Sequence, residues 1–67
     1  MCQATVYLDD EQIATDVIWL EPTKDGILLR TFFGEPQQVR GTLKGVDLLK
    51  HRVLLTSPER MRQGDEP

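Results

Sequence analysis

The sequence is short of the residues that cross-link secreted proteins and of the segments that enter membranes. It has one cysteine in 67 residues, so no disulfide can form within the chain, which excludes a disulfide-stapled secreted scaffold. No apolar run approaches the roughly 20 residues that a membrane-spanning helix needs. No basic and apolar segment typical of a secretory signal stands at its start. We therefore expect a cytoplasmic protein with no membrane partner.

The chain also lacks the residue combinations of conventional catalysis. Ser57 is the only serine, and no glycine-rich phosphate loop is present. Cys2 and His51 would form a nucleophile pair only if the fold brought them together, and nothing in their spacing predicts that. The three adjacent carboxylates at residues 9–11 are typical of an exposed turn rather than of converging acid and base groups. The sequence therefore predicts that the protein is not an enzyme.

The composition is that of a small globular domain. Apolar residues make up 39% and charged residues 28%, with a net charge of −3. A single domain of this length buries only about 60% of the surface that its unfolded chain exposes. Ordering the chain costs roughly 1.5 kcal/mol per residue, so the core leaves little net stability. Because an internal disulfide is excluded, a metal or a second subunit is the expected source of further stability.

Apolar and polar residues alternate with a period of two, which is typical of half-buried strands. At the start of the chain, one face of such a strand holds Cys2, Ala4, Val6 and Leu8. The pattern predicts strands over residues 2–8, 13–21, 27–33, 37–43 and 51–56, with 45–49 as a strand end or one helical turn. No segment has the pattern of an amphipathic helix, so the sequence predicts an all-β protein.

Turn signals separate these strands. Pro22 lacks an N–H group and is expected to end the second strand, and Asp25-Gly26 favours the tight turn that follows. Gly41 is expected to mark a bulge or a bend. We predict one domain, residues 1–56, built as a small closed or partly open β-barrel of about five or six antiparallel strands. A polar C-terminal tail, residues 57–67, follows it.

Three large aromatic residues are expected to be buried. Trp19 lies in the continuous apolar run of residues 17–20, which predicts a strand covered on both faces. Trp19 is therefore expected in the core or as an anchor in a dimer interface. Phe32 and Phe33 are likewise expected in the core or an interface.

Cys2 has unusual chemistry because it lies next to the α-amine. As a small apolar residue, it would simply begin a strand. As a ligand, its sulfur and amide nitrogen would form adjacent chelate rings with the amine of Met1, or with its own amine if Met1 is removed. A nitrogen-rich square-planar set suits Ni(II) or Cu(II), whereas a tetrahedral set suits Zn(II). One chain supplies too few ligands, so we expect two Cys2 residues to meet in a two-fold homodimer.

Residues across most of the chain resemble one known family. They are Met1-Cys2, Phe32-Phe33-Gly34-Glu35, Gly41, Gly45, Val46-Asp47-Leu48, Val53 and Leu55. In these residues the chain resembles the CooT family of small nickel-binding proteins, which has also been labelled as predicted RNA-binding. The resemblance implies a small β-barrel homodimer with one Ni(II) per dimer, linked to nickel supply for carbon monoxide dehydrogenase maturation. Only Cys2, with its neighbouring backbone nitrogens, carries over as a ligand, and His51 is interpreted as a surface residue.

RNA binding is the alternative function. Small barrels bind single strands by stacking bases on aromatic residues, for which Tyr7, Phe32 and Phe33 are candidates. The cations that would form the binding face are Arg40, Lys44, Lys50 and Arg52. The net charge of −3 opposes attraction to phosphate, so nucleic acid is a disfavoured partner. A third interpretation is a structural barrel that binds no ligand, in which Cys2 is only an interface residue.

Overall fold

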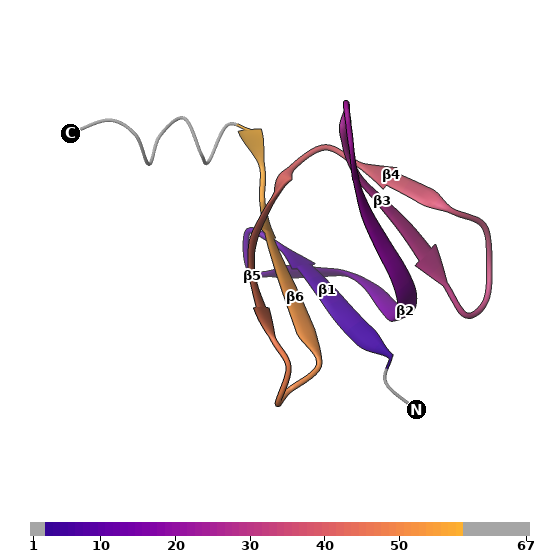
Figure 1. The fold of residues 1–67 in the computed structure, drawn as a ribbon. Coiled ribbons are helices and arrows are strands. Elements are labelled where there is room, and N and C mark those ends of the chain that lie inside the picture. The colour runs from indigo at the N-terminus through magenta and orange to yellow at the C-terminus, as the bar shows by residue number, and fades with distance from the viewer. Residues whose placement is uncertain (1–2, 59–67) are drawn as a thin grey trace.

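The computed structural model describes residues 3–58, and all six of its elements are β-strands (Figure 1). They are β1 (Ala4–Leu8), β2 (Glu11–Thr23), β3 (Gly26–Thr31), β4 (Gln37–Val39), β5 (Thr42–Asp47) and β6 (Arg52–Thr56). The predicted all-β fold is therefore confirmed. Met1, Cys2 and most of the predicted tail, residues 59–67, lie outside the described residues.

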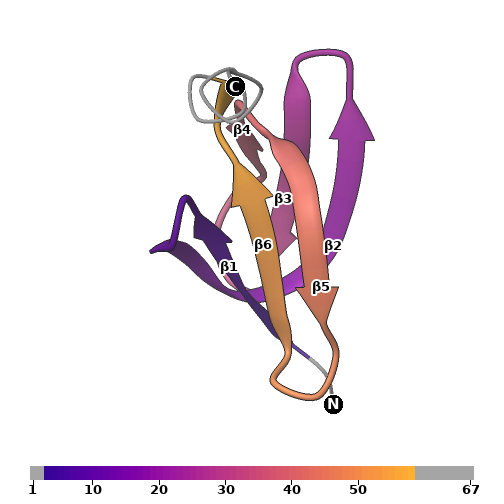
Figure 2. The same ribbon diagram turned by 90° about the vertical axis from the view of Figure 1, so that its left-hand side faces the viewer.

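The six strands form one mixed sheet that bends sharply along β2. The strand order is β4-β3-β2-β1-β6-β5. The first half of β2 pairs with β1 and its second half pairs with β3. The two halves meet near Asp16, which has a φ of 56°, and the register shifts between Val17 and Trp19. The bend turns β3 and β4 toward β6 and β5, so the two halves of the sheet enclose the core (Figures 1 and 2).

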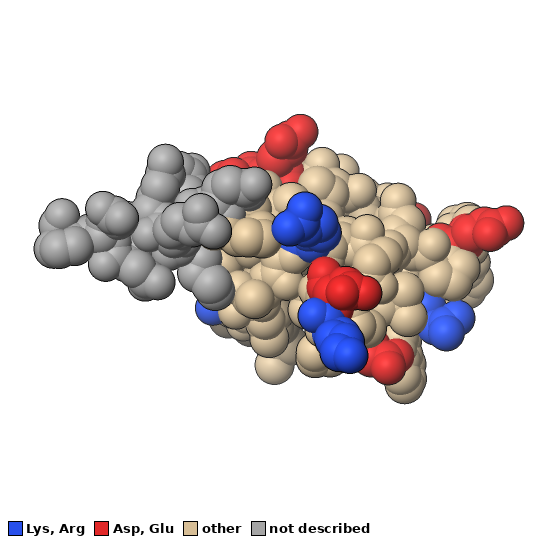
Figure 3. Space-filling model, turned by 90° about the horizontal axis from the view of Figure 1, so that it is seen from above, with Lys and Arg blue, Asp and Glu red and all other residues tan. Residues whose placement is uncertain are grey.

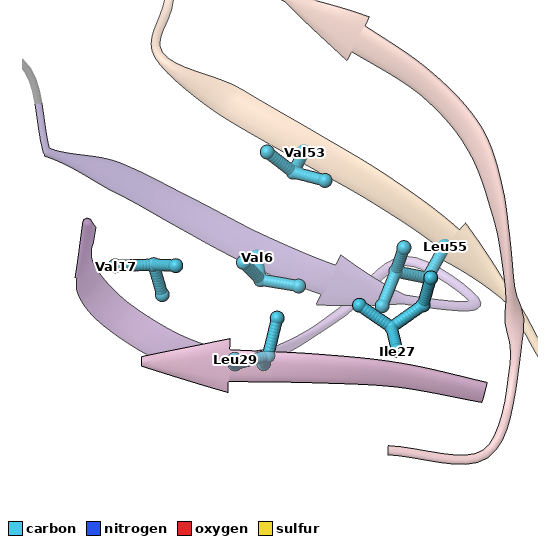
Figure 4. Close-up of a cluster of buried hydrophobic side chains, with 6 residues drawn as sticks. All are labelled: Val6, Val17, Ile27, Leu29, Val53 and Leu55. Carbon is cyan, nitrogen blue, oxygen red and sulfur yellow. The ribbon is translucent and has the colours of Figure 1, made fainter. Parts of the chain in front are cut away.

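The core is made of aliphatic side chains that point between the two halves of the sheet (Figure 4). Its buried members are Val6, Val17, Ile27, Leu29, Val53 and Leu55. These residues follow the alternation in the sequence, which confirms the predicted inward faces of β1, β3 and β6. Each such side chain contributes roughly 1.5–3 kcal/mol when it is fully buried. Six residues make a small core, as the length of the chain led us to expect.

The sheet does not close into a barrel, so the closed form of the prediction is not confirmed. β4 and β5 follow each other in the chain but lie at opposite edges of the sheet. The predicted strand over residues 37–43 is divided between them by Arg40 and Gly41. A Cβ on Gly41 would lie 2.9 Å from the carbonyl oxygen of Thr56. Glycine therefore allows the chain to pass close to β6 as it crosses from one edge to the other, which confirms the predicted bend.

The prediction of antiparallel pairing throughout is wrong for one pair of strands. β1 and β6 are parallel, with Thr5 opposite Arg52 and Leu8 opposite Leu55. A short turn forces consecutive strands to be antiparallel, whereas strands from the two ends of a chain are free of that constraint. This pairing brings the first and last described strands together in the middle of the sheet.

The expected stop at Pro22 is also wrong. β2 continues to Thr23, and Pro22 lies opposite Ile27 of β3. Beyond Val17, β2 is paired with β3 alone. A proline is tolerated in a strand with a free edge, because the missing N–H can belong to the unpaired side.

The turn between β1 and β2 lies at the predicted carboxylates. Asp9 and Asp10 have φ angles of 51° and 71°, as a two-residue hairpin turn of type I′ requires. The Asp9 carboxylate accepts hydrogen bonds from the Ser57 amide, at 3.2 Å, and from the Thr56 hydroxyl, at 3.4 Å. The turn thereby holds the end of β6.

The burial expected for the aromatic residues is not found within the chain. Trp19, Phe32 and Phe33 are exposed, so their assignment to the core is wrong, while the interface alternative stays a prediction. The register shift after Val17 places Trp19 opposite Arg30, which is also exposed. The Trp19 indole N–H donates to Glu21 Oε1 at 3.1 Å. The predicted cover over both faces of this strand is therefore absent from the single chain.

Candidate functional site

The candidate site lies at the end of the sheet where β1 begins. Ala4 is opposite Val17, at the bend of β2, and Thr5 is opposite Arg52, at the start of β6. Met1 and Cys2, the predicted metal ligands, lie outside the described residues. The described structure begins at this end, with Gln3 directly before β1.

A mainly apolar hollow of about 350 Å³ lies beside the start of β1. The turn between β5 and β6 forms its other side, which Figure 1 shows next to the N-terminal end of β1. Its walls are formed by Gln3, Ala4, Val46, Asp47, Leu48, His51, Arg52 and Val53. Residue 3 lines this hollow, so the chain enters the described structure directly at its wall.

The turn between β5 and β6 is fixed by two backbone interactions. The Lys50 amide donates to Asp47 Oδ1 at 3.1 Å, which closes the turn. The Thr5 amide then donates to the His51 carbonyl oxygen at 2.9 Å, which joins the turn to β1. His51 itself has a φ of 55°. The chain's single histidine is thus held next to its N-terminal strand.

The described residues do not form a metal site on their own. Between residues 3 and 58, no group of three or more His, Cys, Asp or Glu side chains could hold an ion. Asp47 and His51 are the two potential ligands in the wall of the hollow. A complete site at this end would therefore need ligands from residues 1–2 or from a second chain.

Exposed apolar side chains occur at the β5–β6 turn, on β5, near the bend of β2 and directly after β3. Leu48 and Leu49, at the β5–β6 turn, are 80% and 93% exposed, and Phe33 is 75% exposed. The Phe32 amide donates to the carbonyl oxygen of Asp16 at 2.9 Å, which ties the end of β3 to the bend of β2. We call this set the apolar rim, and it comprises Ile18, Phe32, Phe33, Val46, Leu48 and Leu49. Large exposed apolar side chains are candidates for an interaction surface.

The cations predicted for RNA binding are exposed but do not share one surface. Lys50 and Arg52 are at the end of the sheet described above, whereas Arg40 precedes Thr42, which pairs with Thr56 at the far end of β6. Lys44 lies between them on β5. Figure 3 shows basic and acidic side chains intermixed on the face that it displays.

The predicted stacking aromatics are likewise separated. The Arg52 guanidinium lies 5.7 Å from the centroid of the Tyr7 ring, so one candidate cation covers one candidate aromatic. The Phe32 and Phe33 rings, 5.3 Å apart, belong to the segment after β3 instead. The described structure therefore does not assemble the predicted basic and aromatic residues into one binding face.

Comparison with known proteins identifies the family. The profile of the CO dehydrogenase accessory protein CooT matches residues 1–56. The chain belongs to the CooT family. A crystal structure assigned to CooT of Carboxydothermus hydrogenoformans has the same fold, with a TM-score of 0.76 and 30% identity over 84% of this chain and 97% of that one. An uncharacterized protein of Methanocaldococcus jannaschii is 26% identical over 55 residues, which are 82% of this chain and 96% of the relative.

Within residues 3–58, no helix has the length and apolar character required to cross a bilayer.

Sequence reasoning missed two features of this site. His51 is exposed, as predicted, but its hydrogen bond to β1 was not expected, because the parallel pairing of β1 and β6 was not foreseen. Sequence reasoning also did not single out Leu48 and Leu49 as exposed. Two adjacent leucines cannot both face inward from a strand, and this signal could have identified an exposed apolar turn.

Proposed function

We propose that this CooT-family protein is a cytoplasmic, non-enzymatic nickel-binding protein that supplies Ni(II) during maturation of a CO dehydrogenase-type enzyme. The family is one of CO dehydrogenase accessory proteins. One observation carries the proposal. The first residues of β1 line an apolar hollow, and exposed apolar side chains of the apolar rim lie on the elements around it. A metal ligand at Cys2 would therefore lie next to a surface suited to a second copy of the chain.

The donor set at the N-terminus fits nickel as the bound ion. In the proposed site, the Cys2 thiolates of two copies and the backbone nitrogens of Met1 and Cys2 hold one Ni(II) per dimer. Thiolate sulfur and nitrogen ligands bind late first-row divalent metals well, and a nitrogen-rich planar set suits Ni(II). The cytosol keeps thiols reduced, which preserves the ligand.

The apolar rim supports the dimer that this site requires. Two copies share one ion at Cys2 only if their N-terminal ends meet, so a two-fold axis must pass near this end of the sheet. A two-fold interface uses the same patch on both copies. Burial of Phe33, Leu48 and Leu49 against a second copy would remove the most exposed apolar side chains of the described chain from water.

The test is a titration with Ni(II) of the wild type and of Cys2→Ser, at known dimer concentration. The wild type is expected to saturate near one ion per dimer with a thiolate charge-transfer band in the ultraviolet–visible spectrum. Cys2→Ser is expected to lose both the band and the tight binding. Affinity is expected to fall at acidic pH, because the thiolate must be deprotonated to bind.

Gln3→Ser is the matched control, because it changes the neighbouring side chain and leaves Cys2 and the backbone nitrogens in place. It is expected to bind like the wild type. Equal Ni(II) binding by Cys2→Ser and the wild type would show that the proposal is wrong. The dispersed cations at Arg40, Lys44, Lys50 and Arg52 favour this proposal over RNA binding.

A further inference from the structure

We infer that a groove at the starts of β3 and β5 binds an extended acidic segment of a partner protein. The groove has a volume of about 750 Å³, a size typical of ligand-binding clefts. Its described walls are residues 22–27, residues 40–43 and Pro58, which come from the β2–β3 turn, the crossover into β5 and the residues after β6. These segments meet at the top of the molecule in Figure 1. The inference goes beyond the proposed function and does not depend on nickel binding.

Two glycines fix the shape of the groove. A Cβ on Gly26 would lie 2.1 Å from the carbonyl oxygen of Val39, and one on Gly41 would lie 2.9 Å from that of Thr56. The β2–β3 turn is therefore packed directly against the end of β4, and the crossover into β5 is packed against the end of β6. Walls held by such close backbone contacts are in place before a ligand arrives, which lowers the conformational cost of binding.

The groove is positively charged in a chain whose net charge is −3. Lys24 and Arg40 are exposed cations on two different walls, and Asp25 is the single carboxylate among the described lining residues. Neither cation forms an ion pair with a carboxylate of residues 3–58. Both charges are therefore available to carboxylates of a bound segment, and this complementarity selects an acidic partner.

The rest of the groove fits apolar side chains on an extended backbone. Its apolar surface comes from Pro22, Ile27, Leu43 and Pro58, and Leu43 is 50% exposed. Leu43 belongs to β5, which stands at one end of the strand order and pairs with β6. Edge strands bind extended segments through main-chain hydrogen bonds, while neighbouring pockets receive alternate side chains. We therefore expect a bound segment in which apolar and acidic residues alternate.

Two other occupants fit the groove less well. A second copy of the chain, joined by a two-fold axis at this groove, would bring its own Lys24 and Arg40 into the same interface, where like charges repel. Single-stranded RNA would meet the two cations, but the described lining residues include no aromatic side chain on which a base could stack.

The charge requirement is tested with a fluorescent hexapeptide in which glutamate and leucine alternate. Its dissociation constant for the full chain is measured by fluorescence anisotropy. Lys24→Gln combined with Arg40→Gln is expected to weaken binding roughly threefold to tenfold, the effect of two exposed ion pairs. Arg30→Gln combined with Lys50→Gln is the matched control, because it removes the same two charges outside the groove. The control is expected to bind at close to wild-type affinity.

The apolar contact is tested with Leu43→Ser, which is expected to weaken peptide binding roughly threefold to tenfold. Leu49→Ser is the matched control, because Leu49 lies in the β5–β6 turn and does not line the groove. In ¹³C-methyl NMR spectra of the wild type, the peptide is expected to shift the resonances of Ile27 and Leu43 and to leave those of Leu49 in place. Circular dichroism of each variant checks that it is folded.

Several outcomes would overturn the inference. They are absence of peptide binding by the wild type, equal weakening by the two double variants, and an unchanged dissociation constant in Leu43→Ser. Binding of an oligouridylate that depends on Lys24 and Arg40, without binding of the peptide, would assign the groove to RNA instead. None of these results changes the comparison of Ni(II) binding between the wild type and Cys2→Ser, so the proposed function is tested separately.

The chain's own residues 59–67 are tested as a competing occupant, because they follow Pro58 and contain three carboxylates. The full chain is prepared with Glu59→Gln, Asp65→Asn and Glu66→Gln together. The methyl resonances of the groove are expected to stay in place when no peptide is present. A shift of these resonances would show that the chain's own segment occupies the groove, and the inference of a partner protein would then be wrong.

Discussion

Replacement of Leu49 by serine should weaken the proposed dimer without unfolding the chain. Leu49 is 93% exposed at the tip of the β5–β6 turn and Leu48 beside it is 80% exposed. Neither residue belongs to the core cluster. A substitution there removes little from the folded monomer, so its main effect should appear in association.

The magnitude follows from the area that a second copy would cover. Burial of a leucine side chain contributes roughly 1.5–3 kcal/mol. A two-fold interface contains the residue twice, so Leu49→Ser should cost about 2 kcal/mol of dimer stability if half of each side chain's exposed surface is covered. A loss of this size raises the dissociation constant about 30-fold.

Sedimentation velocity over a concentration series measures this constant directly. Leu43→Ser is the control, because Leu43 is a half-exposed leucine at the other end of β5, next to the residue that pairs with Thr56. The control is expected to change the dissociation constant little. Unchanged association in Leu49→Ser, or equal weakening in Leu43→Ser, would refute the placement of the interface at the apolar rim.

Two further predictions concern stability and are measured by urea unfolding. Asp9→Gly should lower the free energy of unfolding by about 1–2 kcal/mol. The variant keeps the positive φ of the turn but loses the carboxylate that accepts hydrogen bonds from Thr56 and Ser57. Asp10→Gly controls for the added glycine. An equal loss of stability in Asp10→Gly would contradict this reasoning. Gly26→Ala should cost about 2–4 kcal/mol. Its Cβ would lie 2.1 Å from the carbonyl oxygen of Val39 at a φ of 141°; Gly45→Ala, whose Cβ has no atom within 4 Å, should change stability little.

Much of the core could be read from the sequence, because each buried residue belongs to a local alternation. Ile27 and Leu29 on β3, and Val53 and Leu55 on β6, are buried as their spacing indicates. The alternation fails at Trp19, where the register shift after Val17 changes which residues face inward. A bulge adds one residue to one strand and reverses the faces beyond it, and a short apolar run carries no mark of where that occurs.

The order and pairing of the strands could not be predicted as well as the core. Pairing between strands that are distant in the sequence leaves no pattern in the residues of either strand. Asp25-Gly26 correctly predicted the turn between β2 and β3, and the carboxylates at residues 9–11 correctly predicted a turn after β1. Nothing in the sequence of β1 or β6 indicates that these strands pair in parallel, or that β4 and β5 separate to opposite edges. The open sheet differs from the expected closed barrel for this reason.

The parallel pairing of β1 and β6 also explains which residues of the site could be predicted from the sequence. Cys2 was selected from its own chemistry and from the family resemblance, and its role as a ligand stays a prediction. His51 is joined to the start of β1 by the hydrogen bond between its carbonyl oxygen and the Thr5 amide, which no sequence pattern indicated. Residues brought together by non-local pairing cannot be found from spacing along the chain.

Placement of the metal ligands and the apolar rim at one end of the sheet would couple two equilibria. In the proposed dimer one ion is shared by two chains, so nickel binding and dimerisation must strengthen each other by the same factor. A monomer would offer each ion only half of the thiolates, and dissociation of the dimer would therefore weaken the hold on nickel. A partner that competes for the apolar rim would release the ion by the same linkage. An accessory protein that must bind nickel tightly and then give it up could use such a coupling, and the exposed leucines beside the start of β1 are where it would act.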